Sequence, residues 1–210
     1  MTEISHRSVS ENLQPYAGIC GIIGGIALSA AYLTHPSSAP PETVASTLWI
    51  WVHVGFMASL VGGIFLLMAL FGRYSANRGN LVGFIGFALA VVSLVFVFGL
   101  DYAEIFIFPT MAVEFPLVVE TYGDGTMMPS IAFAFPATGI AFVIGFILFS
   151  WELMRTKTIS KTAGWLTIFG TVIFGFGLSG LAPMIVVRIG SVVFGAGLIA
   201  LGLSLIRKRS

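Results

Sequence analysis

Residues 81–109 read LVGFIGFALAVVSLVFVFGLDYAEIFIFP, and this stretch decides the fold class. The 20 residues before Asp101 carry no charge, which is about the length that an α-helix needs to cross a bilayer. Asp101 and Glu104 follow at the end of the apolar run. Ionisable side chains at such depth are rare and usually face the protein interior or a water-filled cavity. The stretch therefore predicts a membrane span that ends in a candidate site.

The composition of the whole chain agrees with this prediction. Of its 210 residues, 57% are hydrophobic and 9% are charged, whereas soluble domains average about 25% charged residues. The net charge of +1 argues against nucleic acid as a partner, because binding phosphates needs a concentrated basic surface. The lone Cys20 lies in an apolar run and is expected to be a packing residue.

Similar apolar runs recur along the chain and predict an all-α, polytopic membrane protein with six transmembrane helices in one bundle. Connections rich in Pro, Gly and polar residues separate these runs and are expected to be irregular. The domain organisation is then a lead at 1–14, a single transmembrane domain at 15–206 and a basic tail at 207–210. The expected helices cover residues 16–33 (with Pro15 in the first turn), 47–71, 81–108, 130–153, 162–181 and 184–206.

The basic residues predict the orientation of these helices. With six crossings, nine of the ten basic residues fall on one side of the membrane, and only Arg188 does not. Lys and Arg are enriched in cytoplasmic loops of membrane proteins. We therefore expect both termini in the cytoplasm.

Three of the expected helices bring polar side chains to nearly the same depth. His53 lies six residues into its helix and Arg188 five residues into the last one, so both are about 8–9 Å from the outer surface at 1.5 Å per residue. Asp101 and Glu104 are spaced i and i+3 and share one helix face. We interpret His53, Asp101, Glu104 and Arg188 as ligand-binding residues, with Arg188 as the counter-ion of the carboxylates.

The same four residues could instead lie at the membrane–water interface, where polar side chains need no binding site. If the hydrocarbon core covers only residues 82–100 of that helix, Asp101 and Glu104 lie among lipid headgroups. His53 and Arg188 then contact lipid phosphate or water. The sequence leaves a protein-lined cavity and an interfacial belt as alternatives.

The chemistry of this layer points to no metal and no cofactor, because there is no paired Glu-x-x-His motif and no second histidine within the spans. The leading hypothesis is an outward-facing polar pocket that binds or passes a small amphipathic or lipid-like molecule. A first alternative is a non-catalytic accessory subunit of a larger membrane complex. A second is an intramembrane enzyme that uses His53 and a carboxylate as base and acid.

Glycines in the last two expected helices add a prediction about partners. Small residues let membrane helices approach closely. They predict either a tightly packed hairpin or contacts with further subunits in a homo-oligomer or a larger membrane complex, besides contacts with membrane lipid. These glycines are Gly170, Gly175, Gly177, Gly180, Gly190, Gly195, Gly197 and Gly202.

Several short motifs follow one another in a fixed order along most of the chain. This order resembles the layout of DUF4386-type hypothetical proteins, which are uncharacterised small membrane proteins of bacteria. The resemblance implies a six-helix protein of the bacterial cytoplasmic (inner) membrane and brings no activity with it. The motifs are Tyr32-Leu33-x-His35-Pro36, Trp51-x-His53, Gly83-x-x-Gly86-Phe87 and Asp101-Tyr102-x-Glu104 with Pro109.

Overall fold

The computed structural model describes residues 9–36, 39–122, 128–179 and 182–207, and in these ranges the chain forms helices and no strand. Six of the described helices are long and apolar enough to cross a membrane, which confirms the predicted all-α bundle. They are α1 (Val9–Thr34), α3 (Thr47–Arg78), α4 (Leu81–Phe106), α7 (Pro129–Arg155), α8 (Lys161–Leu178) and α9 (Met184–Ile206).

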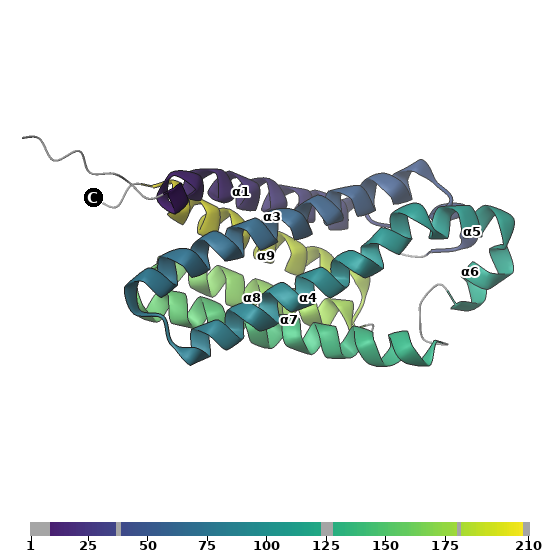
Figure 1. Cartoon of the computed structure of the whole chain (residues 1–210). Coiled ribbons are helices and arrows are strands. Elements are labelled where there is room, and N and C mark those ends of the chain that lie inside the picture. Colours follow the sequence, from purple (N-terminus) through teal and green to yellow (C-terminus); the bar gives the residue numbers. More distant parts are fainter. Residues whose placement is uncertain (1–8, 37–38, 123–127, 180–181, 208–210) are drawn as a thin grey trace, which may run out of the picture.

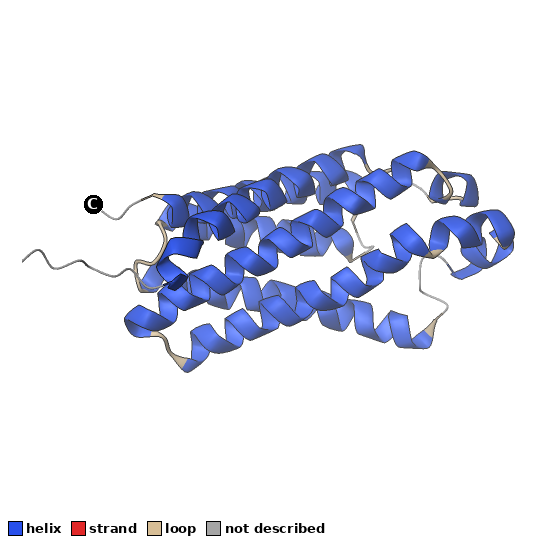
Figure 2. Ribbon diagram, turned by 45° about the horizontal axis from the view of Figure 1, so that its top comes forward, coloured by secondary structure: helices blue, strands red, loops and turns tan. Residues whose placement is uncertain are grey.

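The six long helices form a closed ring (Figures 1 and 2). Each packs against the next one along the chain, and α9 returns to pack against α1. The start of α1 and the end of α9 lie together with the α3–α4 and α7–α8 connections, at what we call the termini end (Figure 1). The opposite end, which we call the capped end, carries three short helices: α2 (Pro41–Val44), α5 (Phe108–Glu114) and α6 (Pro116–Tyr122).

The short helices correct the prediction that the connections at the capped end are irregular. Pro41 and Pro116 are the first residues of α2 and α6, and Pro109 is the second residue of α5. Proline suits a first helical turn, because the N–H that it lacks would have no helical partner there. The cap has a small apolar core of its own, made of Val44, Trp49, Ala112 and Val119.

Two helix boundaries differ from the sequence-based prediction at the termini end. Helix α3 continues to Arg78, although a turn was expected from residue 72, because Tyr74 is fully buried and anchors this extension. Helix α1 begins at Val9, so Pro15 lies inside the helix and not in its first turn.

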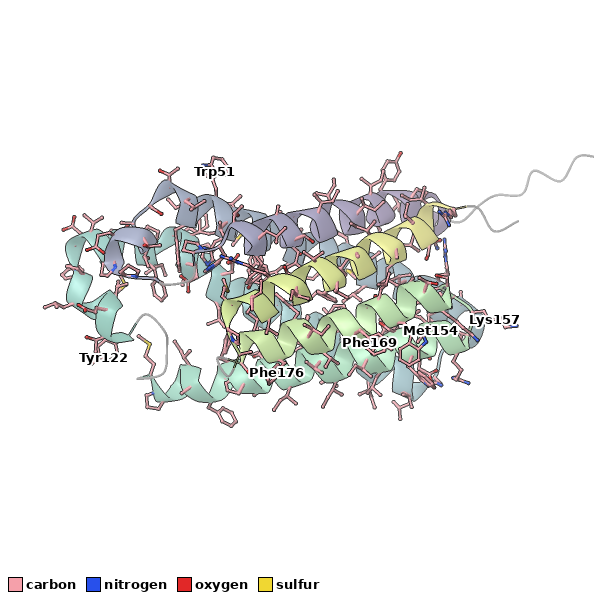
Figure 3. All side chains as sticks on the ribbon, turned by 180° about the vertical axis from the view of Figure 1, so that it is seen from behind. Trp51, Tyr122, Met154, Lys157, Phe169 and Phe176 are labelled. Atoms are coloured by element: carbon pink, nitrogen blue, oxygen red, sulfur yellow. The ribbon has the colours of Figure 1, made fainter. Side chains whose placement is uncertain are left out.

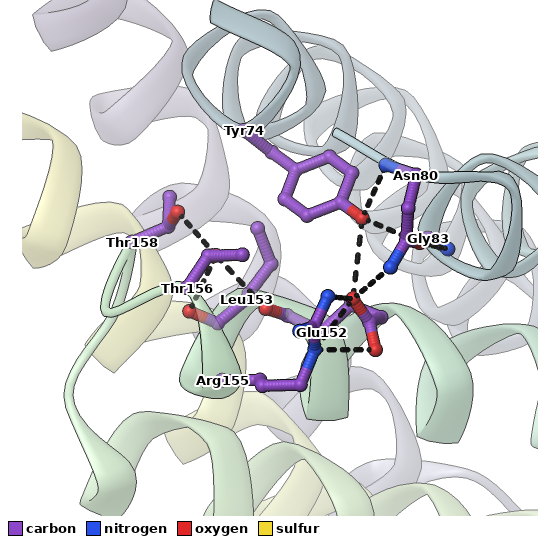
Figure 4. A network of polar contacts seen from close by, with 8 residues as sticks. All are labelled: Tyr74, Asn80, Gly83, Glu152, Leu153, Arg155, Thr156 and Thr158. Atoms are coloured by element: carbon purple, nitrogen blue, oxygen red, sulfur yellow. Dashed lines mark hydrogen bonds and ion pairs between the residues drawn. The ribbon is translucent and has the colours of Figure 1, made fainter. Parts of the chain in front are cut away.

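A buried polar network joins α3, α4 and α7 at the termini end (Figure 4). The carboxylate of Glu152 is 5% exposed and accepts hydrogen bonds from Asn80 Nδ2 at 2.9 Å and from the Tyr74 hydroxyl at 3.3 Å. Arg155 donates to the same carboxylate at 2.7 Å. Asn80 also caps α4, since its side-chain oxygen accepts from the backbone N–H of Gly83. Every strong acceptor in this network has a donor.

Close backbone contact closes the ring between its first and last helices. Gly18 and Gly25 of α1 face Gly202 and Gly195 of α9, and a Cβ on Gly18 would lie 2.6 Å from the carbonyl oxygen of Gly202. Only glycine allows such an approach. The helices α8 and α9 are packed as tightly as α1 and α9. This agrees with the prediction of a tightly packed hairpin, and the alternative of a subunit contact stays a prediction. In the hairpin, Gly170, Gly177, Gly190 and Gly197 each face the backbone of the other helix. Of the other predicted glycines, Gly195 and Gly202 face α1, Gly175 faces Val143 of α7, and Gly180 lies outside the described residues.

Candidate functional site

An apolar cavity of about 500 Å³ lies inside the ring, and side chains from all six long helices line it. Its wall is almost entirely aliphatic and aromatic, with Leu60, Leu94, Phe142 and Phe174 among the lining residues. Small-molecule sites in proteins have volumes of roughly 300–1,000 Å³ and mostly apolar walls. Volume and lining therefore suit a hydrophobic ligand or the hydrophobic part of one.

The cavity reaches the outer surface of the bundle on the side of α7 and α8. Phe135, Ile140 and Ile144 of α7, and Val172 and Phe176 of α8, line the cavity and are also exposed on the outside. Figure 3 shows this side of the molecule, with Phe176 labelled on α8. Since these helices are apolar enough to span a membrane, the opening faces the lipid.

Pro136 lies inside α7 and lines the cavity. A proline inside a helix cannot donate to the carbonyl oxygen four residues earlier, which here belongs to Ala132. Interrupted backbone at membrane depth is tolerated where it lines a cavity or is buried in protein. The position of Pro136 is consistent with that rule.

Polar residues gather directly beyond the cavity, toward the capped end. Leu94 and Val97 of α4 line the cavity, and Asp101 follows them seven and four residues later on the same helix face. His53 lies three residues before the lining residue Phe56 in α3. Residues from α1, the segment after it, α3, α4 and α9 meet here. We call them the polar cluster: Tyr32, His35, Trp49, His53, Asp101, Glu104 and Arg188.

Three carboxyl oxygens of the cluster are buried without a hydrogen-bond partner within the described chain. Asp101 is 3% exposed, and neither of its carboxyl oxygens has a hydrogen-bond partner. The buried Oε2 of Glu104 has none either. Both carboxyl groups lie close enough to Tyr32 for their charges to act on its hydroxyl. Because Tyr32 also lines the cavity, it connects the carboxyl groups with the apolar space.

Arg188 does not form the ion pair expected from the sequence. The only ion pair among the described residues joins Arg155 and Glu152, at the termini end. Arg188 instead donates from Nη2 to the backbone oxygen of His35 at 3.0 Å, and its buried Nε has no partner. The sequence predicts that the guanidinium of Arg188 pairs with the carboxyl groups. The guanidinium binds the backbone oxygen of His35 instead, because the segment after α1 lies within reach of α9.

The rings of two histidines and a tryptophan are in contact in the middle of the cluster, in edge-on and tilted arrangements. The ring of His53 lies 4.5 Å from that of Trp49 and 5.3 Å from that of His35. Nδ1 of His53 lies 2.9 Å from the backbone oxygen of Trp49, and Nδ1 of His35 lies 2.7 Å from that of Pro36. Since a carbonyl oxygen only accepts, both rings donate from Nδ1. Among the described residues, neither ring is hydrogen-bonded to a carboxyl group.

His35 lies between the spans, and its charge state follows from its surroundings. Burial lowers the pKa of this ring below its ordinary 6.5. The hydrogen bond to the Pro36 oxygen raises the pKa of His35, whereas the positive charge of Arg188 lowers it further. His35 is therefore neutral at pH 7. In the described part of the chain, no three His, Cys, Asp or Glu side chains come together as metal ligands would.

The structure brings all four sequence-predicted residues to one region and adds three that the sequence analysis did not select. Tyr32 lies at the end of the first expected helix and His35 after it, and Trp49 lies near the start of the second. One signal was available for Trp49, because it precedes His53 by four residues and so shares its helix face. Trp49 also donates from Nε1 to the backbone oxygen of Glu104 at 3.2 Å, which ties α3 to α4 beside the carboxyl groups.

The comparisons with known proteins give no match. This holds for the models of protein families, for curated proteins and for solved structures. The resemblance to DUF4386-type proteins stays a prediction, and function has to be argued from the site.

Proposed function

We propose that this integral membrane protein binds or passes a small amphipathic or lipid-like molecule. The apolar part of the ligand lies in the cavity, and its polar part reaches the polar cluster. One observation carries the proposal: a cavity of about 500 Å³ adjoins Asp101, a buried carboxyl group without a protein partner. Tyr32 belongs to both the wall of the cavity and the cluster.

The energetics of the two parts favour an amphipathic ligand over a polar or a purely apolar one. The cavity wall offers almost no hydrogen-bonding group, so a polar metabolite would lose its hydration without compensation. A purely apolar ligand would leave the carboxyl oxygens of Asp101 unmatched, which is costly for a buried group. A molecule with an apolar tail and a polar head group would fill the apolar cavity and also give the carboxyl oxygens of Asp101 a partner. The exposed lining residues of α7 and α8 give such a molecule a route from the lipid.

The orientation in the membrane is part of the proposal. We place both termini in the cytoplasm and the chain in a bacterial cytoplasmic membrane, with the polar cluster facing outward. The distribution of basic side chains supports this orientation, because Lys and Arg are enriched on the cytoplasmic side of membrane proteins. Described basic residues at or near the termini end are Arg73, Arg155, Lys157, Lys161 and Arg207.

Photoaffinity labelling tests ligand binding in the cavity. The full chain in lipid nanodiscs is irradiated with a C12 alcohol that carries a diazirine at mid-chain, and labelled residues are mapped by mass spectrometry. We expect labels within 135–146 of α7 and 172–179 of α8. Gly139→Leu should abolish them, because Gly139 lines the cavity and a Cβ there meets nothing within 4 Å, so the new side chain fills the space.

Gly99→Leu is the matched control. A Cβ on Gly99 also meets nothing within 4 Å, but Gly99 is exposed on α4 and does not line the cavity. This variant should keep the wild-type labelling. Labels spread evenly over all lipid-facing helices, and unchanged by Gly139→Leu, would contradict the proposal. Conversion of the probe to a product of different mass would instead support the intramembrane enzyme.

A further inference from the structure

We infer that the head group recognised by the polar cluster is a cation with hydrogen-bond donors, such as the ammonium group of a long-chain amine or an amino lipid. This inference rests on the proposed function and narrows its ligand class. It comes from the buried carboxyl group of Asp101, which lies one helical turn beyond the cavity-lining Val97 and has no partner among the described residues. The buried Oε2 of Glu104 has none either.

In the hydrogen bonds described for the cluster, the donors bind backbone oxygens, and none binds the carboxyl group of Asp101. Arg188 donates to the backbone oxygen of His35. His53 donates to the backbone oxygen of Trp49, and the indole N–H of Trp49 donates to the backbone oxygen of Glu104. The acceptors left over are carboxyl oxygens, and the group that complements a carboxylate best is a charged donor. A carboxylate or phosphate head group would face the unpartnered carboxyl oxygens of Asp101, and it could be held only through Arg188, whose buried Nε has no partner among the described residues.

Aromatic rings on the cavity side of the carboxyl groups favour a cation as well. Tyr32 lines the cavity, and it packs edge-on against Phe56 at 5.2 Å and against Phe174 at 4.9 Å. A cation near an aromatic face is attracted by the ring, most strongly where water is excluded. The alkyl chain of an amine seated at Asp101 would continue past Tyr32 along Leu94 into the apolar space.

Three C12 probes with the same mid-chain diazirine test the inference, one ending in an ammonium, one in a hydroxyl and one in a carboxylate group. In nanodiscs of zwitterionic lipid, we expect the ammonium probe to label the cavity at a concentration about tenfold lower than the alcohol, as one charge-assisted hydrogen bond would provide. The carboxylate probe should label least. Asp101→Asn should remove the preference for ammonium and leave labelling by the alcohol unchanged.

Glu114→Gln is the matched control, because it also converts a carboxyl group to an amide, but on an exposed residue of α5 outside the cluster. It should keep the ammonium preference. Equal labelling of the cavity by all three probes, or stronger labelling by the carboxylate, would overturn the inference and leave the proposed function intact. Absence of cavity labelling by every probe would overturn both.

Discussion

The closure of the ring by α1 and α9 makes a quantitative prediction for Gly18→Ala. A Cβ on Gly18 would lie 2.6 Å from the carbonyl oxygen of Gly202 and 2.9 Å from Cγ1 of Ile206, whereas ordinary contact begins at 3.4 Å. The backbone oxygen cannot turn away as a flexible side chain can. The two helices must therefore separate locally by about 0.8 Å, and overpacking of this kind costs roughly 1–3 kcal/mol.

The matched variant is Gly99→Ala. Gly99 also lies inside a long helix, but a Cβ there meets nothing within 4 Å. Alanine is the better helix former by about 1 kcal/mol, and both variants gain this contribution. The difference between them thus isolates the clash, and we expect Gly18→Ala to be less stable than Gly99→Ala by about 1–3 kcal/mol.

The assay is equilibrium unfolding in mixed micelles with an increasing fraction of sodium dodecyl sulfate, followed by far-UV circular dichroism. The two variants and the wild type are compared at constant protein and lipid concentration, so that differences in midpoint report stability. If Gly18→Ala proved as stable as Gly99→Ala, α1 and α9 would not be in close contact. The closed ring, and with it the cavity inside the ring, would then be refuted.

Three further predictions follow from the polar groups. Glu152→Ala should lower the free energy of unfolding by about 2–3 kcal/mol in the same assay, because the charge-assisted hydrogen bond from Asn80 is lost; an unchanged midpoint would contradict the network. His35 has a folded pKa below 6.5, so the unfolded state binds more protons in this range, and stability should fall as the pH drops through 6.5 towards 5. Thermal unfolding at several pH values should show this loss, and His35→Gln should weaken it. Asp101→Asn and Arg188→Gln should change stability additively, since no ion pair joins them; a double variant that deviated from the sum would reveal a pairing that the structure lacks.

The fold was accessible from the sequence because hydrophobic length alone sets the number of spans. The short helices of the cap were not, since seven residues such as Phe108–Glu114 give no clear period and their only sign was a proline near the start. The contact that closes the ring is visible in the sequence as a spacing of glycines. Gly18 and Gly25 are seven residues apart, as are Gly195 and Gly202, and two such stripes of equal spacing are what a close helix pair requires.

The depth of the candidate site was also predictable, but its partners were not. Position along a helix follows from the residue number, so His53, Asp101 and Arg188 were expected at the same end of the bundle, and their helices bring them to the capped end. Which groups then meet depends on the rotation of each helix and on the path of the chain between helices. The carbonyl of His35 lies in such a connection, and no sequence pattern marks it as the acceptor of Arg188.

A comparison within the chain shows why the unpaired state of Asp101 is informative. Glu152 and Asp101 are both buried carboxyl groups on long helices, 5% and 3% exposed. Around Glu152 the fold supplies Asn80, Tyr74 and Arg155 as donors, which is how this chain treats a carboxylate with a structural role. Around Asp101 it supplies none, although Trp49, His53 and Arg188 carry suitable donors in the same cluster. An interfacial belt does not explain this difference, because a carboxyl group among lipid headgroups would be exposed, and an unpaired one that is buried is costly. The contrast therefore favours a donor from outside the chain, and the neighbouring apolar cavity is where such a molecule would place its tail.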